Sequence, residues 1–166
     1  MGVLFDYFRA PDAKAAARAV ELPGGPLLPE PAFDGVEAKG IDPCVVLGQL
    51  VAFIRGVPWD VDLVRTVLVW PPPETQPATE EEYEALPEDS PWKEGPLLQA
   101  LDRDVRDTLG TVDDARLPAL AAQWARIEEF HHTMRTDDAL SLIKDLVGLA
   151  RRARDAGHPL YCWSSL

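Results

Sequence analysis

The chain is poor in the residues that carry most enzyme chemistry. Its 166 residues include two cysteines, three histidines and four serines, and the patterns G-x-S-x-G, H-E-x-x-H and C-x-x-C are absent. A phosphate-binding loop is absent too, because no lysine, serine or threonine follows Gly24 and Gly25 at the required spacing. The sequence therefore predicts no catalytic residue and no cofactor, and it favours a protein that is not an enzyme.

Long apolar runs and basic stripes are also missing. No apolar segment reaches the roughly 20 residues that a membrane span needs, and Asp6 and Arg9 interrupt the first segment, so that it does not resemble a signal peptide. The net charge of −12 repels phosphate backbones. Cys44 and Cys162 show no disulfide-framework spacing. We therefore expect a cytoplasmic protein that binds neither nucleic acid nor membranes, and the excess of arginine over lysine suggests a GC-rich bacterial genome.

What the chain has in excess is acid, and much of it lies in one proline-rich stretch. Residues 71–96 hold eight carboxylates and one base, Lys93. Two interpretations stay open: a solvated loop that keeps the protein soluble, or a docking strip for a basic partner. Thr79 fits a capping box, but the prolines and charges predict an otherwise irregular, mobile segment. It would be anchored by Tyr83, Leu86 and Trp92, and the candidate partner contacts are Glu80, Glu81, Glu82 and Glu84.

Apolar periodicity and capping signals predict a mixture of strands and helices without regular βαβ alternation. A helix over residues 43–55, apolar on nearly every side, should be the central buried helix. We therefore expect one α+β domain over residues 1–166, with a small, mostly antiparallel or mixed sheet, several helices, and residues 71–96 as an insertion. The predicted strands cover residues 3–8, 36–38, 66–70 and 160–166, and the other helices cover residues 12–21, 97–109, 118–130 and 137–156.

The last thirty residues carry the clearest structural signal. An amphipathic helix ends at Gly157, and Pro159 prevents its continuation. The following segment, residues 160–166, is rich in strand-forming residues. We expect it to lie inside the sheet, beside the first strand, with Tyr161 and Trp163 on one face and Leu160 and Cys162 on the other.

One cluster of possible ligands deserves a test against the structure. On a helix, Glu128 would lie beside His131 and His132, and Glu-x-x-His is half of a carboxylate-bridged di-metal site. The second half is missing, and His158 has no such neighbour. The simpler interpretation is a polar helix end. We therefore predict no metal site and keep Glu128, His131 and His132 as candidate ligands only.

Cys44 and the tryptophans are the remaining candidates. Cys44 falls in the first turn of the helix over 43–55, where the dipole favours a thiolate, but Asp42 opposes that charge and the surroundings are apolar. A structural cysteine is therefore favoured. Five tryptophans could line a ligand pocket or serve as core and loop anchors. They are Trp59, Trp70, Trp92, Trp124 and Trp163.

Several short patterns can be compared with a known family: Met1-Gly2, Tyr7-Phe8, the segment 97–109, Asp113-Asp114 before Trp124, and Ala153-Arg154-Asp155-Ala156-Gly157 followed by Leu160. Together they resemble the YfbM-like family of small bacterial proteins. The resemblance covers the two ends better than the middle, and residues 71–96 and 161–163 depart from it. It implies an α+β fold and supplies no catalytic residues.

Two functions are compatible with these features. The leading hypothesis is a non-enzymatic protein, monomeric or homodimeric, that binds a basic protein partner, as an immunity protein or an antitoxin-like inhibitor does. The alternative is a small-molecule-binding protein or an enzyme of unrecognised type. In that case a tryptophan-lined pocket would use Glu128, His131 and His132 as polar contacts.

Overall fold

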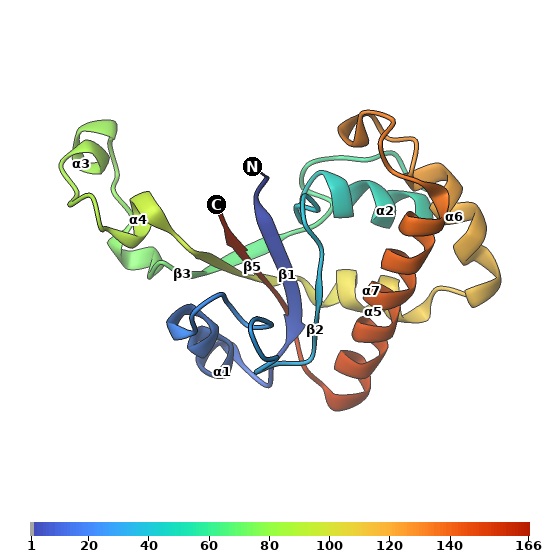
Figure 1. Ribbon diagram of the computed structural model, residues 1–166, viewed down its shortest axis with the longest axis horizontal. Coiled ribbons are helices and arrows are strands. Elements are labelled where there is room, and N and C mark those ends of the chain that lie inside the picture. Colours follow the sequence, from blue (N-terminus) through green and yellow to red (C-terminus); the bar gives the residue numbers. More distant parts are fainter. Residues whose placement is uncertain (1) are drawn as a thin grey trace.

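The computed structural model describes residues 2–166, and there the chain forms one five-stranded sheet with helices on both faces (Figure 1). The strand order is β2-β1-β5-β4-β3, and all neighbouring pairs are antiparallel. The α+β class is therefore confirmed, and the predicted strand at residues 66–70 is found with the same bounds. The strands are β1 (Leu4–Arg9), β2 (Gly35–Glu37), β3 (Thr66–Trp70), β4 (Leu97–Leu101) and β5 (Leu160–Ser165).

The helices differ greatly in length, from one turn to the 21 residues of the last one. That last helix ends in the predicted way, with Gly157 in the left-handed conformation at φ 70°. The α-helices are α1 (Ala13–Ala17), α2 (Val46–Arg55), α3 (Glu80–Glu84), α4 (Pro91–Glu94), α5 (Arg103–Thr111), α6 (Leu117–Trp124) and α7 (Thr136–Ala156).

Strand β5 lies in the middle of the sheet, between β1 and β4. Because successive side chains of a strand point to opposite faces, its residues divide between two cores. Leu160 and Cys162 join the large core beneath the helices, and Tyr161 and Trp163 join a smaller one on the opposite face. Both the predicted position of this strand and its predicted faces are confirmed.

Helices α2, α5, α6 and α7 cover one face of the sheet (Figure 1). The Asp42 carboxylate accepts hydrogen bonds from the N–H groups of residues 44–46 at 2.7 to 3.2 Å and so begins α2. Trp124 of α6 is fully buried and donates from Nε1 to the Val46 carbonyl at 2.8 Å. The predicted central helix over 43–55 is confirmed, although its regular part begins at Val46.

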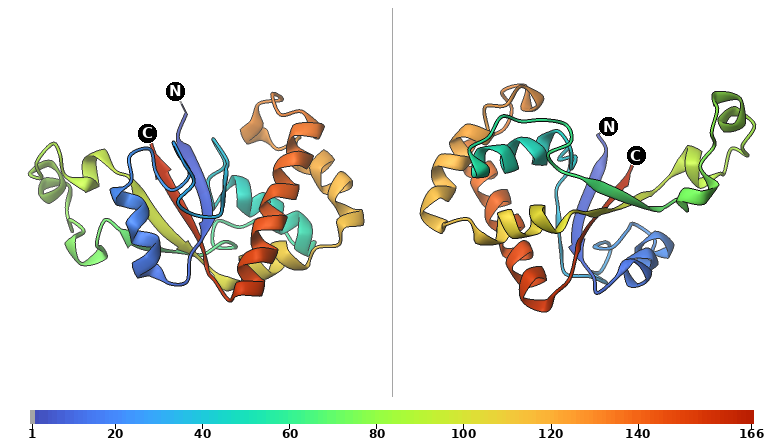
Figure 2. Two further views of the ribbon diagram at one scale, coloured as in Figure 1. Left: turned by 60° about the horizontal axis from the view of Figure 1, so that its bottom comes forward. Right: turned by 180° about the vertical axis from the view of Figure 1, so that it is seen from behind.

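The opposite face is covered by α1 and the loop that follows it (Figure 2). Asp12 caps α1, as predicted, by accepting from the N–H of Ala15 at 2.8 Å. The Phe8 ring lies 4.7 Å from that of Phe33 and 5.7 Å from that of Tyr161, measured between centroids. This smaller core holds the covering loop against the sheet.

The prediction of a helix over residues 97–109 is wrong for its first half. Residues 97–101 form strand β4, which pairs with β3 and β5. Helix α5 begins after Asp102, whose carboxylate accepts from the N–H of Asp104 at 3.2 Å. Leu98, Leu101, Val105 and Leu109 are buried, whereas Leu97, which belongs to the same apolar pattern, is 40% exposed. Pairing with distant strands overrides a spacing that also fits a helix.

Candidate functional site

Residues 71–96, which we call the acidic arm, connect β3 to β4 and project from the body on the side away from the helical layer (Figures 1 and 2). Helix α3 follows Thr79, whose hydroxyl accepts from the N–H of Glu82 at 3.1 Å, while the Glu82 carboxylate accepts from the N–H of Ala78 at 2.7 Å. Helix α4 follows Ser90 and has proline at its first position, where proline is tolerated. The predicted cap is confirmed, and the predicted lack of regular structure is wrong.

Lys93 holds the acidic arm together from within. Its Nζ donates to the carbonyl of Leu86 at 2.8 Å and to that of Glu84 at 3.1 Å, and it pairs with Glu88 at 3.3 Å. It also lies 6.0 Å from the centre of the Tyr83 ring. These bonds use the only base of the arm for internal contacts. The cation is therefore not available to neutralise the other carboxylates.

Trp92, another of the predicted anchors, also forms its hydrogen bond inside the arm. The indole of Trp92 donates to the Thr75 hydroxyl at 3.0 Å. Two of the three predicted anchors, Tyr83 and Trp92, thus make their cation–π or hydrogen-bond contacts with other residues of the segment.

All eight acidic residues of the acidic arm are exposed, although the Glu82 carboxylate also caps α3 and that of Glu88 pairs with Lys93. Glu80, Glu81, Glu82 and Glu84 are all exposed, and none of them forms a salt bridge within residues 2–166. Eight acids against one lysine give the arm a formal charge of −7 out of −12 for the whole chain. An exposed charge of this size on a projecting segment attracts cationic surfaces at distances up to about a Debye length, ~8 Å at physiological salt.

A groove of about 440 Å³ lies between the acidic arm and the start of α2. Strands β1, β4 and β5 supply one side, on the sheet face that the helices only partly cover, and α4 supplies another. This volume falls within the roughly 300–1,000 Å³ of typical ligand sites. We call it the arm groove; its lining includes Phe5, Asp42, Pro43, Cys44, Pro91, Trp92, Glu94, Leu97, Gln99 and Ser164.

The arm groove offers little for nucleophilic catalysis. The half-buried Cys44 thiol makes a long contact of 3.8 Å with the Val64 carbonyl. Burial raises the pKa of this thiol, and the carboxylates of Asp42 and Asp62 raise it further. The predicted opposition of Asp42 to thiolate formation is confirmed. The second cysteine, Cys162, is buried, and burial raises its pKa as well. Both thiols are therefore weak nucleophiles at neutral pH.

A larger and more open concavity, about 740 Å³, lies between β2 and α7. Its central charge, Asp34, pairs with Arg152 at 2.8 Å and with Arg9 at 2.7 Å. The hydrogen bond from Arg152 holds the pKa of Asp34 below its usual value. These contacts tie Asp34, immediately before β2, to β1 and to α7. We therefore interpret the residues around this concavity as structural.

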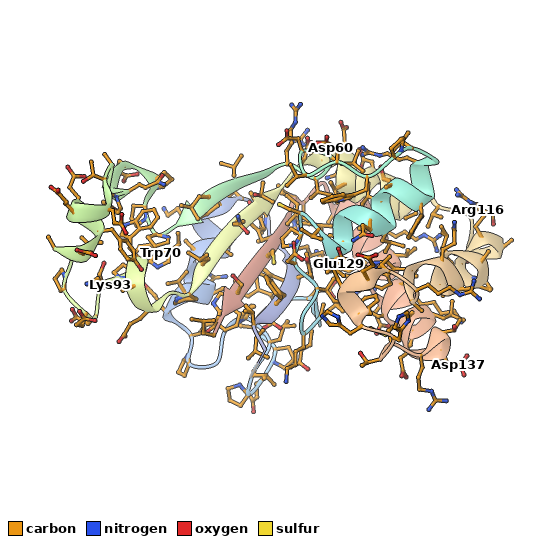
Figure 3. All side chains as sticks on the ribbon, turned by 90° about the horizontal axis from the view of Figure 1, so that it is seen from above. Asp60, Trp70, Lys93, Arg116, Glu129 and Asp137 are labelled. Atoms are coloured by element: carbon orange, nitrogen blue, oxygen red, sulfur yellow. The ribbon has the colours of Figure 1, made fainter. Side chains whose placement is uncertain are left out.

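The cluster of possible ligands is dispersed by the backbone. Helix α6 ends at Trp124, and Glu128–Phe130 is a single 3₁₀ turn, so the helix predicted over 118–130 is wrong in its second half. His131 and His132 follow with positive φ values of 47° and 61°, and both are exposed. Helical Glu-x-x-His geometry is therefore lost. Figure 3 shows Glu129 in the helical part of the molecule, far from Lys93 in the acidic arm.

The tryptophans do not gather around one pocket. Trp124 lies in the large core, and Trp59 donates to the Cys44 carbonyl at 3.0 Å from the surface. Trp70 and Trp163 face the smaller core, whereas Trp92 lines the arm groove. Within residues 2–166, no group of three or more His, Cys, Asp or Glu side chains is placed to hold a metal ion.

An acidic side chain is buried on the sheet face opposite the arm groove. Asp6 is 5% exposed and lies in one row across the sheet with Glu37, Trp163, Leu98 and Trp70. Burial, and to a lesser extent the charge of Glu37, raises the pKa of Asp6 to about 6. The indole N–H groups of Trp70 and Trp163 are buried without an acceptor in the described part of the chain.

Comparison with known proteins found no matching family model, no curated relative and no similar solved structure. The resemblance to the YfbM-like family stays a prediction. Among the residues that the structure describes, no helix combines the length and the hydropathy needed to cross a lipid bilayer.

Proposed function

We propose that this protein binds a basic partner protein through the acidic arm, in the manner of an immunity protein or an antitoxin-like inhibitor. One observation carries the proposal: the carboxylates are displayed on a folded projection whose single lysine is used for internal contacts. The charge of −7 is therefore presented outward on short helices with defined caps.

Electrostatic physics supports a role in association. A projecting acidic surface steers a cationic partner during diffusion and raises the association rate, while repelling anionic partners. Solubility alone requires charge but no fixed geometry. The capped helices and the three acceptors around Lys93 Nζ give the arm a defined shape, and shape is what specific recognition uses.

Reversal of four charges tests this role. In the variant Glu80→Lys, Glu81→Lys, Glu82→Lys and Glu84→Lys, we expect the association rate of a partner captured on the wild-type protein to fall at least about tenfold, with a weaker dependence on salt. Stopped-flow or surface-based kinetics at several salt concentrations measures both quantities.

A matched control carries the same change in net charge outside the arm. It replaces four other exposed glutamates with lysine, and we expect a much smaller loss of rate because these residues do not belong to the arm. Equal effects of the two variants would leave only non-specific charge and contradict the proposal. The control positions are Glu21, Glu30, Glu128 and Glu129.

A further inference from the structure

We propose that the arm groove receives an apolar side chain of the basic partner, so that the recognised segment is an aromatic or large aliphatic residue flanked by lysines or arginines. This inference rests on the proposed function and names the chemistry of its partner. The arm alone explains attraction to any cation. The groove beside it adds a reason for selecting one particular sequence.

The lining of the arm groove is apolar and partly open. Leu97 of β4 remains 40% exposed, although it lies beside buried sheet residues. Phe5, Pro43 and the Trp92 indole surround the same space from β1, the start of α2 and α4. Exposed apolar surface in a concavity gains free energy when another apolar group covers it. A groove of about 440 Å³ has room for a large side chain and the backbone that carries it.

The polar groups of the arm groove favour a cationic segment over an anionic one. Glu94 brings an exposed carboxylate to the lining, and Asp42 adds negative charge although its oxygens are bonded to the start of α2. The Lys93 ammonium, whose residue also lines the groove, is held by the arm. Ser164 lines the groove, is only 9% exposed, and its hydroxyl takes part in none of the hydrogen bonds found within residues 2–166. The amide of Gln99 donates to Thr66 at 3.2 Å and leaves its oxygen as an acceptor. The Glu94 carboxylate, the Ser164 hydroxyl and the Gln99 amide oxygen therefore offer acceptors to the N–H groups of a bound segment.

Charge also decides between the partners that an apolar groove could accept. A second copy of the chain brings another net charge of −12, and a membrane of anionic lipids brings negative charge as well. Both are repelled by the acidic arm at the edge of the groove. A segment in which one apolar residue is flanked by cations is complementary to both the arm groove and the acidic arm. The apolar residue fills the groove, and its cationic neighbours face the carboxylates of the arm.

Three synthetic peptides separate the two contributions. The first has a central phenylalanine with three lysines on each side, the second has serine in place of phenylalanine, and the third keeps phenylalanine but has glutamate in place of lysine. Calorimetry at low salt should show that the first peptide binds at least about tenfold more tightly than the second, because only the first buries an aromatic ring. The third should not bind measurably.

Substitution of two equally exposed leucines tests whether the phenylalanine of the peptide binds in the arm groove. Leu97 and Leu4 are each 40% exposed on strands of the same sheet, but only Leu97 lines the arm groove. Leu97→Gln should remove the advantage of the phenylalanine peptide over the serine peptide, and Leu4→Gln should preserve it. Neither substitution changes the charge of the arm.

The outcomes distinguish this inference from the proposed function. If the phenylalanine and serine peptides bind equally, and the four-glutamate reversal still abolishes binding of both, then the arm binds cations and the groove inference is wrong. If neither lysine peptide binds, or if the glutamate peptide binds as well as the lysine peptide, the inference is also overturned. An equal response of Leu97→Gln and Leu4→Gln would place the apolar contact outside the groove.

Discussion

Among single residues, Asp6 fits its surroundings least well. It occupies the centre of β1, 5% exposed, opposite Trp163 on one side and Glu37 on the other. No hydrogen bond to its carboxylate is found within residues 2–166, and its pKa is raised to about 6. A buried carboxyl in this position favours its neutral form, because the ionised form loses hydration and is repelled by Glu37.

Asp6 should therefore make stability depend on pH in a defined direction. Its pKa is higher in the folded chain, about 6, than the ordinary value of 3.8. The folded state holds the proton more tightly, so its contribution to the free energy of unfolding is complete below about pH 4 and declines as the pH rises to about 6. Two pKa units correspond to at most about 3 kcal/mol.

The substitution Asp6→Asn measures this contribution. We expect the variant to be more stable than the wild type at pH 7 by about 1–3 kcal/mol and to lose most of the decline between pH 4 and pH 6. Urea unfolding across that range gives both values. The control Asp89→Asn changes an exposed aspartate and should change neither. A variant less stable than the wild type at pH 7 would show that the carboxylate has a stabilising partner.

At the scale of elements, capping and stop residues in the sequence were sufficient to predict where several helices begin or end. Asp12, Asp42 and Gly157 each mark a helix end that the structure contains, and the alternation in residues 160–165 gave the correct faces of β5. Residues 97–101 were misassigned, because leucines at helical spacing also satisfy a strand of which one face is buried. What decides between them is pairing with β3 and β5, and β5 lies about sixty residues further along the chain.

We expect the order of the acidic arm to depend on one side chain, Lys93. Substituting Lys93→Met keeps the aliphatic stem and removes the ammonium that binds two carbonyls and Glu88. We expect amide hydrogen exchange in residues 80–94 to become about ten to a hundred times faster, because even one hydrogen bond to a charged group contributes about 1.5–3 kcal/mol and the exposed partners of Lys93 reduce the worth of the others. Exchange in the sheet should stay unchanged.

A matched lysine controls for the loss of charge. Lys14 is exposed in α1 and makes none of the hydrogen bonds found in the described residues, so Lys14→Met should leave exchange in the arm at its wild-type rate. Unchanged exchange in the arm of Lys93→Met would mean that the capped helices α3 and α4 hold the arm without the lysine.

At the scale of the whole molecule, the acidic arm lies at one end and the helical layer at the other (Figures 1 and 3). The charge of the arm was evident from the sequence, since it lies in one continuous stretch. The arm groove could not be predicted from the sequence, because its lining comes from the first strand, the start of α2, the arm and the last strand. Ser164 and Leu97 carry no local signal of a site, and only the register of β4 against β5 brings them opposite each other.

The acidic arm joins two adjacent antiparallel strands, so it can be exchanged without altering the rest of the sheet. Replacement of residues 72–95 by a short Gly/Ser linker should preserve the melting transition to within a few degrees, because the arm side chains bond to one another and not to the large core. Circular dichroism on heating provides this control for the binding experiment. A variant that fails to fold would place the segment in the core.

The most direct measurement of the binding role compares the wild type and this linker variant, immobilised side by side and exposed to the same cell extract at low and physiological salt. Retained proteins are identified by mass spectrometry, and their association rates are then measured with purified components. We predict a basic protein that is retained by the wild type, lost from the folded linker variant, and associates more slowly as salt rises. Retention of the same protein at the same rate by both forms, or of no protein specific to the wild type, would contradict recognition through the acidic arm.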